Sequence, residues 1–193
     1  MKYLIYLAFM AIAIPVSAQN GGFVLSYPIA LPMGSTTDYI SKTSFRGINM
    51  EFLKAVRPGL ELGLETGWNV FYQKEEEKEY KEGTASVSGI QYRYINAVPI
   101  LAEAKFYKTS GRSLPFAGLG LGVLYVDQST DFGLYRLSND AWQFCLRPEI
   151  GFMFKAEKGV LPYIGAKYYL GFNGDELDGQ SFISINIGLM FSK

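Results

Sequence analysis

The chain has 193 residues, with 18 Lys and Arg against 18 Asp and Glu, no His and one Cys. The neutral charge balance leaves no electrostatic footprint for nucleic acid, and the lack of His removes the commonest metal ligand and most routes to acid–base catalysis. A single Cys excludes an intrachain disulfide and a multi-cysteine zinc site. From the charge balance, the lack of His and the single Cys together, we expect no nucleic-acid partner, no metal and no other cofactor.

The N-terminus has the pattern of a secretion signal. Lys2 gives a positive start, an apolar stretch too short to span a bilayer follows it, and small residues precede a cleavage site at Ala18. We expect cleavage between Ala18 and Gln19, so that residues 1–18 are a signal peptide and residues 19–193 form one domain. A buried helix of the mature domain is the alternative interpretation. After the signal, the sequence contains no run of about 18 apolar residues, so we expect no membrane-spanning helix.

Beyond the signal, apolar residues alternate with small or polar ones at a period of two. Such alternation is typical of strands, because successive side chains of a strand point to opposite faces. The last segment is the clearest, since every odd position from Ile183 to Phe191 is Ile, Leu or Phe. We expect eight strands, at residues 22–29, 48–52, 60–72, 98–107, 117–125, 142–154, 163–172 and 183–191.

The connections between these strands alternate in length. The short ones are rich in turn formers and lie at 56–59, 110–113 and 157–159. The longer, polar ones lie near 33–43, 74–91, 129–141 and 173–180. This plan predicts an all-β fold, an eight-stranded antiparallel up-and-down transmembrane β-barrel with both chain ends on the side of the short turns.

The two faces of the strands decide which side of the barrel meets water. One face of nearly every strand is aliphatic or aromatic. The other carries glycines, amides and eight charged residues, which are Glu51, Glu61, Glu65, Glu103, Lys105, Arg147, Glu149 and Lys167. A soluble barrel such as a lipocalin turns its charges to water, whereas an outer-membrane barrel turns them into the lumen.

Aromatic residues favour the membrane barrel, because they gather near both ends of the apolar faces as interfacial girdles do. They are Tyr72, Tyr92, Tyr94, Trp142 and Phe172 next to the longer loops, and Phe106, Phe152, Phe154 and Phe191 next to the short turns. We therefore expect a polar, side-chain-filled lumen. A soluble periplasmic barrel that binds an apolar ligand inside remains the alternative.

Two stretches stand out beside the signal and the alternation of strands and loops: Gly67-Trp68-Asn69-Val70-Phe71-Tyr72, and the ending from Ile185 to Phe191. In these features residues 19–193 resemble the small outer-membrane β-barrel domain proteins of Gram-negative bacteria. The resemblance implies an integral location in the bacterial outer membrane, in contact with outer-membrane lipid. It also implies that the last strand is read by the barrel-assembly machinery through Ile187, Leu189 and Phe191.

The charged residues of the lumen are expected to pair, because a lone buried charge is costly. If the turn at 157–159 is tight, Glu149 lies directly across from Lys167, and Arg147 across from Tyr169. We expect a charge network that fills and closes the lumen. A narrow, low-conductance pore is the alternative.

No catalytic residue is expected. Outer-membrane barrels that are hydrolases activate a nucleophile or a water with His, which this chain lacks, and a carboxylate pair such as Glu61 and Glu65 would point into a lumen with poor substrate access. We expect a structural or surface-interaction role in the cell envelope. The segments 74–91 and 129–141 are the candidate contacts for a surface partner.

Overall fold

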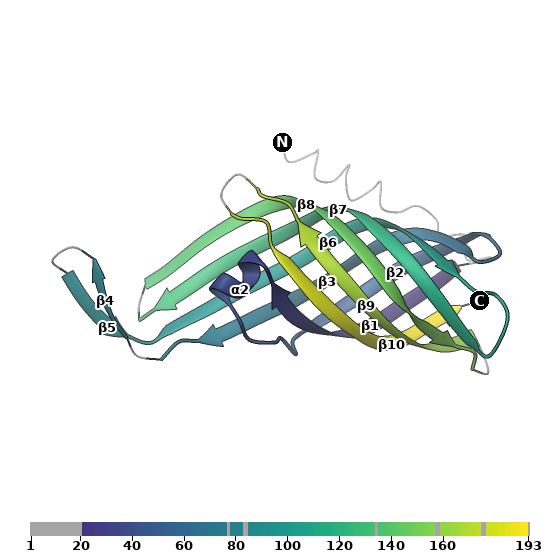
Figure 1. Ribbon diagram of the computed structural model, residues 1–193, viewed down its shortest axis with the longest axis horizontal. Coiled ribbons are helices and arrows are strands. Elements are labelled where there is room, and N and C mark those ends of the chain that lie inside the picture. Colours follow the sequence, from purple (N-terminus) through teal and green to yellow (C-terminus); the bar gives the residue numbers. More distant parts are fainter. Residues whose placement is uncertain are drawn as a thin grey trace, which may run out of the picture.

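Eight antiparallel strands close into a barrel in the computed structural model of the chain (Figure 1). The structure describes residues 21–76, 78–82, 85–133, 135–156, 159–174 and 177–192. The expected signal peptide, residues 1–18, and its cleavage site between Ala18 and Gln19 lie outside the described residues.

Each barrel strand lies next to its neighbours in the sequence, and the first pairs with the last to close the ring. The strands are β1 (Gly21–Met33), β2 (Gly47–Arg57), β3 (Leu60–Lys74), β6 (Gln91–Tyr107), β7 (Ser113–Phe132), β8 (Tyr135–Phe154), β9 (Val160–Gly171) and β10 (Ser181–Ser192). The predicted eight-stranded, antiparallel, up-and-down barrel is confirmed. Its short turns and both ends of the described chain lie at one end, here called the turn end, and the longer connections lie at the other, the loop end (Figure 1).

One short helix, α2 (Ser35–Tyr39), follows β1 at the loop end. Its C-terminal neighbour Ile40 is fully buried and packs with Phe71 and Phe182, which places this connection over the mouth of the barrel. Among the described residues, no helix is long and apolar enough to cross a membrane.

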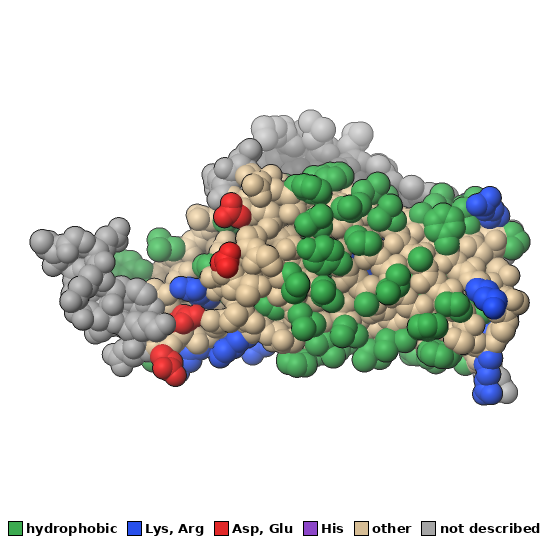
Figure 2. Space-filling view, in the orientation of Figure 1, with side chains coloured by type: hydrophobic (Ala, Val, Ile, Leu, Met, Phe, Trp, Pro, Cys, Tyr) green, Lys and Arg blue, Asp and Glu red, His purple; other side chains and the backbone are tan. Residues whose placement is uncertain are grey.

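The apolar faces of the strands point outward, as the alternation predicts. Leu64, Trp142 and Ile150 are 59%, 59% and 66% exposed, whereas Glu51 and Arg147 on the opposite faces are fully buried. Figure 2 shows the result as a band of hydrophobic side chains along the barrel, with the charged side chains toward its two ends. A surface of this kind is matched to lipid and not to water.

Aromatic rings line both borders of the apolar band. At the loop end Tyr72 stacks on Tyr92 with ring centroids 6.4 Å apart. At the turn end Phe23 lies 5.1 Å from Phe52 and 6.3 Å from Phe191. Rings at these two levels match the two aromatic girdles that border the apolar band of membrane barrels.

Two segments that were expected to be loops are instead strands. The segment 129–141 belongs to the hairpin of β7 and β8, which pairs without interruption up to Phe132 and Tyr135. The segment 74–91 contains a second, two-stranded sheet of β4 (Lys78–Glu82) and β5 (Ala85–Gly89). In residues 135–140 of β8 the period-two signal fades because both faces of the strand are exposed, although the hydrogen-bonded ladder continues.

The seam between β1 and β10 depends on a glycine. Gly188 lies opposite Ser26, and a Cβ at this glycine would lie 2.1 Å from the Leu25 carbonyl oxygen and 2.6 Å from the Ser26 Cα. Both contacts are with backbone, which cannot move without spreading the two strands.

We therefore expect Gly188→Ala to lower the free energy of unfolding by about 1–3 kcal/mol, the usual cost of overpacking. Urea titration of the protein in detergent micelles measures this loss. Gly22→Ala on the same strand pair is the matched control, because its Cβ would meet the movable Cε of Met190 at 2.5 Å. An equal loss in both variants would contradict the close approach at the seam.

Candidate functional site

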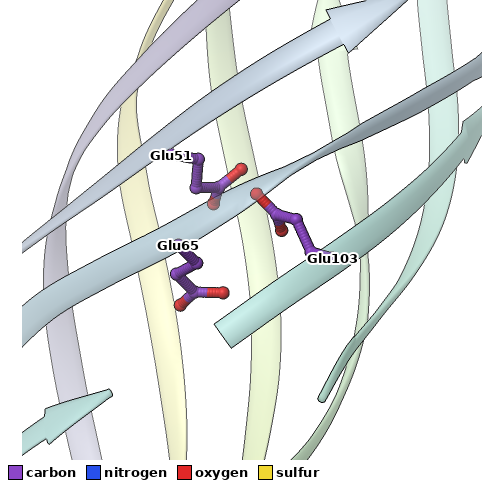
Figure 3. Close-up of side chains that lie close together, drawn as sticks. All are labelled: Glu51, Glu65 and Glu103. Atoms are coloured by element: carbon purple, nitrogen blue, oxygen red, sulfur yellow. The ribbon is translucent and has the colours of Figure 1, made fainter. Parts of the chain in front are cut away.

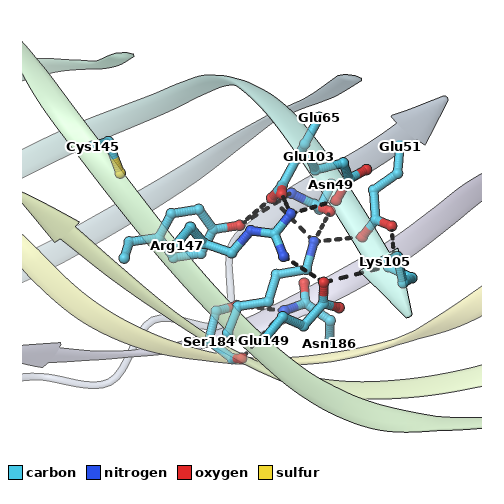
Figure 4. A network of polar contacts seen from close by, with 12 residues as sticks. Asn49, Glu51, Glu65, Glu103, Lys105, Cys145, Arg147, Glu149, Ser184 and Asn186 are labelled. Atoms are coloured by element: carbon cyan, nitrogen blue, oxygen red, sulfur yellow. Dashed lines mark hydrogen bonds and ion pairs between the residues drawn. The ribbon is translucent and has the colours of Figure 1, made fainter. Parts of the chain in front are cut away.

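Five strands supply the charged residues of the lumen, and most of these side chains gather in one polar network (Figure 4). Strand β2 supplies one, β3 and β6 supply two each, β8 supplies two and β9 supplies one. All are at most 5% exposed: Glu51, Glu61, Glu65, Glu103, Lys105, Arg147, Glu149 and Lys167. Their side chains therefore interact with one another and not with bulk water.

Arg147 is the centre of the network. Its guanidinium group pairs with three carboxylates, those of Glu65, Glu103 and Glu149. A planar guanidinium presents five N–H donors in a fixed arrangement, against three for an ammonium group, so it is suited to serving three carboxylates at once. Gly118 and Gly120 on the adjacent β7 leave room for it, since a Cβ at Gly120 would lie 3.1 Å from the Arg147 Nε.

The two lysines join the remaining carboxylates. Lys105 pairs with Glu51 and lies 3.6 Å from the Glu149 carboxylate. Lys167 also pairs with Glu51 and lies 3.0 Å from the Glu65 carboxylate. With the three pairs of Arg147, these contacts link seven of the eight predicted residues into one continuous charge network.

Glu61 is the residue that the structure leaves out of the network. Among the described residues it makes no ion pair, although it lies opposite Lys105 in the ladder of β3 and β6. Its Oε1 accepts a hydrogen bond of 3.4 Å from the Tyr107 hydroxyl. The reason is that the Lys105 ammonium turns toward the middle of the lumen, where it can reach two carboxylates.

The expectation for Glu149 and Lys167 is confirmed for their positions in the ladder and wrong for their ion pair. The two residues lie directly opposite each other in β8 and β9, although residues 157 and 158 of the expected turn lie outside the described residues. Their charged groups nevertheless pair elsewhere, Glu149 with Arg147 and Lys167 with Glu51 and Glu65. In a barrel this narrow a long side chain reaches the opposite wall, so register alone does not decide the partner.

Neutral lumen residues complete the network, and among them only Tyr169 was expected from the sequence to lie across from a charged residue, Arg147. The hydroxyls of Tyr163 and Tyr169 donate hydrogen bonds to Glu149 and Glu65. Asn49 donates to the Glu65 Oε1 at 2.8 Å and accepts from the Lys167 Nζ at 2.7 Å. Their signal in the sequence was their place on the polar faces of the strands, where Asn49 and Tyr169 lie two residues from Glu51 and Lys167.

Three carboxylates of the network approach each other closely enough to raise the question of a metal site. Oxygens of Glu51, Glu65 and Glu103 lie within 4.8 Å of one another (Figure 3). Carboxylate oxygens suit hard cations such as Ca²⁺. Each of these three residues, however, already pairs with Arg147 or a lysine, so cationic side chains hold the positions that a metal would take.

Apolar side chains close the lumen above and below the charges, which the expectation of a polar lumen did not include. Toward the loop end, one buried cluster contains Phe71, Ile95 and Leu124. Toward the turn end, another buried cluster contains Leu53 and Met153. The charge network is thus a middle layer between two apolar layers.

The remaining predicted residues lie on the outer surface. Ile187, Leu189 and Phe191 point outward from β10 and are 51%, 42% and 42% exposed. At the loop end, the hairpin of β7 and β8 exposes Tyr135 and Leu137 to 79% and 74%.

No protein-family model matches the sequence, and no curated protein matches it either. Solved structures do match. Surface protein A of Neisseria (NspA) aligns over 90% of this chain and 97% of its own, at 12% sequence identity and a TM-score of 0.62. The outer membrane protease OmpT of Escherichia coli aligns over 92% of this chain and 98% of its own, at 5% identity and a TM-score of 0.53. The chain therefore has the fold of the outer-membrane β-barrels of Gram-negative bacteria.

Proposed function

We propose that this protein is an integral barrel of the bacterial outer membrane, with a sealed lumen and a structural or surface-interaction role in the cell envelope. The observation that carries the proposal is the combination of an apolar, aromatic-bordered exterior with a lumen whose cations are fully buried. The exterior supports a location in lipid. The interior supports a closed barrel.

Closure of the lumen is supported by three successive layers. Arg147, Lys105 and Lys167 are each 0% exposed and are held by carboxylates on several strands. Apolar clusters lie on both sides of them. An eight-stranded barrel has room for side chains and little else, so these layers leave no continuous path for water.

A binding role for the lumen has little support. A soluble barrel that binds an apolar ligand needs an apolar cavity, whereas charges fill the middle of this lumen. The protease OmpT shows that the fold alone does not exclude an enzyme. We propose a non-enzymatic role because the chain has no His and its lumen carboxylates are committed to buried cations.

The outer surface provides the contacts of the proposed role. The outward face of β10, with Ile187, Leu189 and Phe191, is the surface proposed for the barrel-assembly machinery. The segments 74–91 and 129–141, which form hairpins at the loop end, are proposed to meet a surface partner outside the cell.

The orientation of the barrel can be tested with single cysteines. Ser138 and Ser110 are exposed at the loop end and the turn end, and the native Cys145 is fully buried. We expect a bulky membrane-impermeant maleimide to label Ser138→Cys in intact cells and Ser110→Cys after the outer membrane is opened. Labelling of Ser110→Cys in intact cells, with Ser138→Cys protected, would contradict the proposed orientation.

The sealing role of the charge network predicts a difference between two substitutions. Arg147→Gln leaves three buried carboxylates without their shared cation, so we expect it to lower the free energy of unfolding by about 3–5 kcal/mol. Glu103→Gln is the matched control. It removes one carboxylate from a network of four carboxylates and three cations, so its effect is expected to be smaller. Urea titration in micelles measures both.

Planar bilayers test the same proposal by a second route. We expect the wild-type barrel and the Glu103→Gln variant to show no stable single-channel steps. Steady channels in the wild-type protein, with a conductance that Arg147→Gln changes while its stability stays unchanged, would favour the narrow pore instead.

A further inference from the structure

Basic side chains surround the turn end of the barrel. Among the described residues, five exposed cations lie there, on the short turns and the strand ends beside them: Lys54, Arg57, Lys108, Arg112 and Lys155. Within the described part of the chain, this end carries no exposed Asp or Glu. Figure 2 shows Lys and Arg without Asp or Glu at this end, and charges of both signs at the other.

The net charge of the chain conceals this rim. Charges of the two signs balance over the whole sequence, 18 against 18. Much of the negative charge lies inside the lumen, where Glu51, Glu65, Glu103 and Glu149 outnumber their cations, and more lies at the loop end. Within the described residues, the outer rim of the turn end is therefore basic although the protein as a whole is neutral.

A shallow, wide-open cavity of about 790 Å³ lies at this rim, between the turn that joins β2 to β3 and the connection from β6 to β7. Arg57 and Lys108 stand on its polar side. Leu60, Phe106 and Pro115 form an apolar side. Leu60 and Phe106 are opposite each other in the ladder of β3 and β6, so the apolar side is a regular part of the barrel wall.

The apolar side of the cavity continues into the lipid-facing surface. Phe106 is 52% exposed and points outward, like Leu62 and Leu64 further along the barrel wall. A molecule in this cavity would meet hydrocarbon-like surface toward the middle of the barrel and cations toward its end. That order matches an amphiphile that lies in the membrane with its anionic head at the interface.

We propose that this rim cavity binds an anionic phospholipid, with the phosphate between Arg57 and Lys108 and an acyl chain along Leu60 and Phe106. The inference rests on the proposed function, because it requires the barrel to lie in a membrane. A soluble anionic polymer of the cell wall would use the cations but would leave the apolar side without a partner. The lipid satisfies both sides.

Native mass spectrometry of the detergent-purified full chain tests the site with phosphatidylglycerol as the probe and phosphatidylcholine as the uncharged reference. The test variant is Arg57→Gln combined with Lys108→Gln. Each cation near a membrane surface contributes about fivefold to the binding of an anionic lipid, so we expect about 30-fold weaker retention of phosphatidylglycerol. Phosphatidylcholine retention should stay unchanged.

The matched control removes the same charge from the opposite end. Arg46 and Lys74 lie over the rings of Tyr72 and Tyr92 at the loop end, at 5.2 and 6.0 Å from the ring centroids. Arg46→Gln combined with Lys74→Gln should retain phosphatidylglycerol as the wild-type protein does. Equal losses in the two double variants would show a general charge effect and would overturn the site.

Two further outcomes would overturn the proposal. Displacement of the lipid by millimolar inorganic phosphate would show a site for the anion alone, and preferential binding of a soluble peptidoglycan fragment would assign the rim to the cell wall. Failure of the proposed function is distinguishable, because it would appear as a protein that does not fractionate with membranes. A membrane-integral barrel whose rim variant keeps the lipid contradicts this inference alone.

Discussion

A charge inside an eight-stranded barrel has almost no water to solvate it, and this constraint shapes the whole protein. Ring closure satisfies the backbone hydrogen bonds and fixes the diameter, so lumen side chains must satisfy one another. Arg147 meets this demand by serving three carboxylates. Lys105 and Lys167 bridge the others across the lumen. Removing one cation leaves several carboxylates uncompensated, which makes the network a single unit and not a set of independent pairs.

The same constraint explains why the exterior, the lumen and the two ends of the barrel have different roles. The apolar surface lies on the exterior, where outward-facing residues such as Leu62 and Trp142 are exposed. The lumen holds the register of the strands and closes the barrel, since its charges join strands that are far apart in the ring. The hairpin of β7 and β8 at the loop end and the basic rim at the turn end do not have to stabilise the charge network, so the two ends can differ in composition.

How far the sequence predicts this structure depends on what surrounds each strand. Where lipid lies on one side and the lumen on the other, the period of two is strong, and both the outward face of β10 and the opposition of Glu149 and Lys167 follow from it. Beyond the membrane both faces are wet, so the continuation of β7 and β8 past Ser129 reads as a loop although the ladder persists. The ion-pair partners could not be predicted either, because side chains reach across the lumen. The apolar layers of the lumen, such as the one around Leu124, were not predicted either. Glycines dominate the face of β7 on which Leu124 lies, so that face did not stand out as apolar.

The most direct measurement of the central claim is the gel mobility of the protein from fractionated membranes, with boiled and unboiled samples compared in detergent. A barrel with an apolar exterior and a buried charge network should sediment with the outer membrane and resist unfolding by detergent at room temperature. The unboiled protein should therefore run faster than the boiled one. A protein in the soluble fraction, with the same mobility before and after boiling, would contradict the assignment of the apolar faces to lipid and of the charges to a closed lumen.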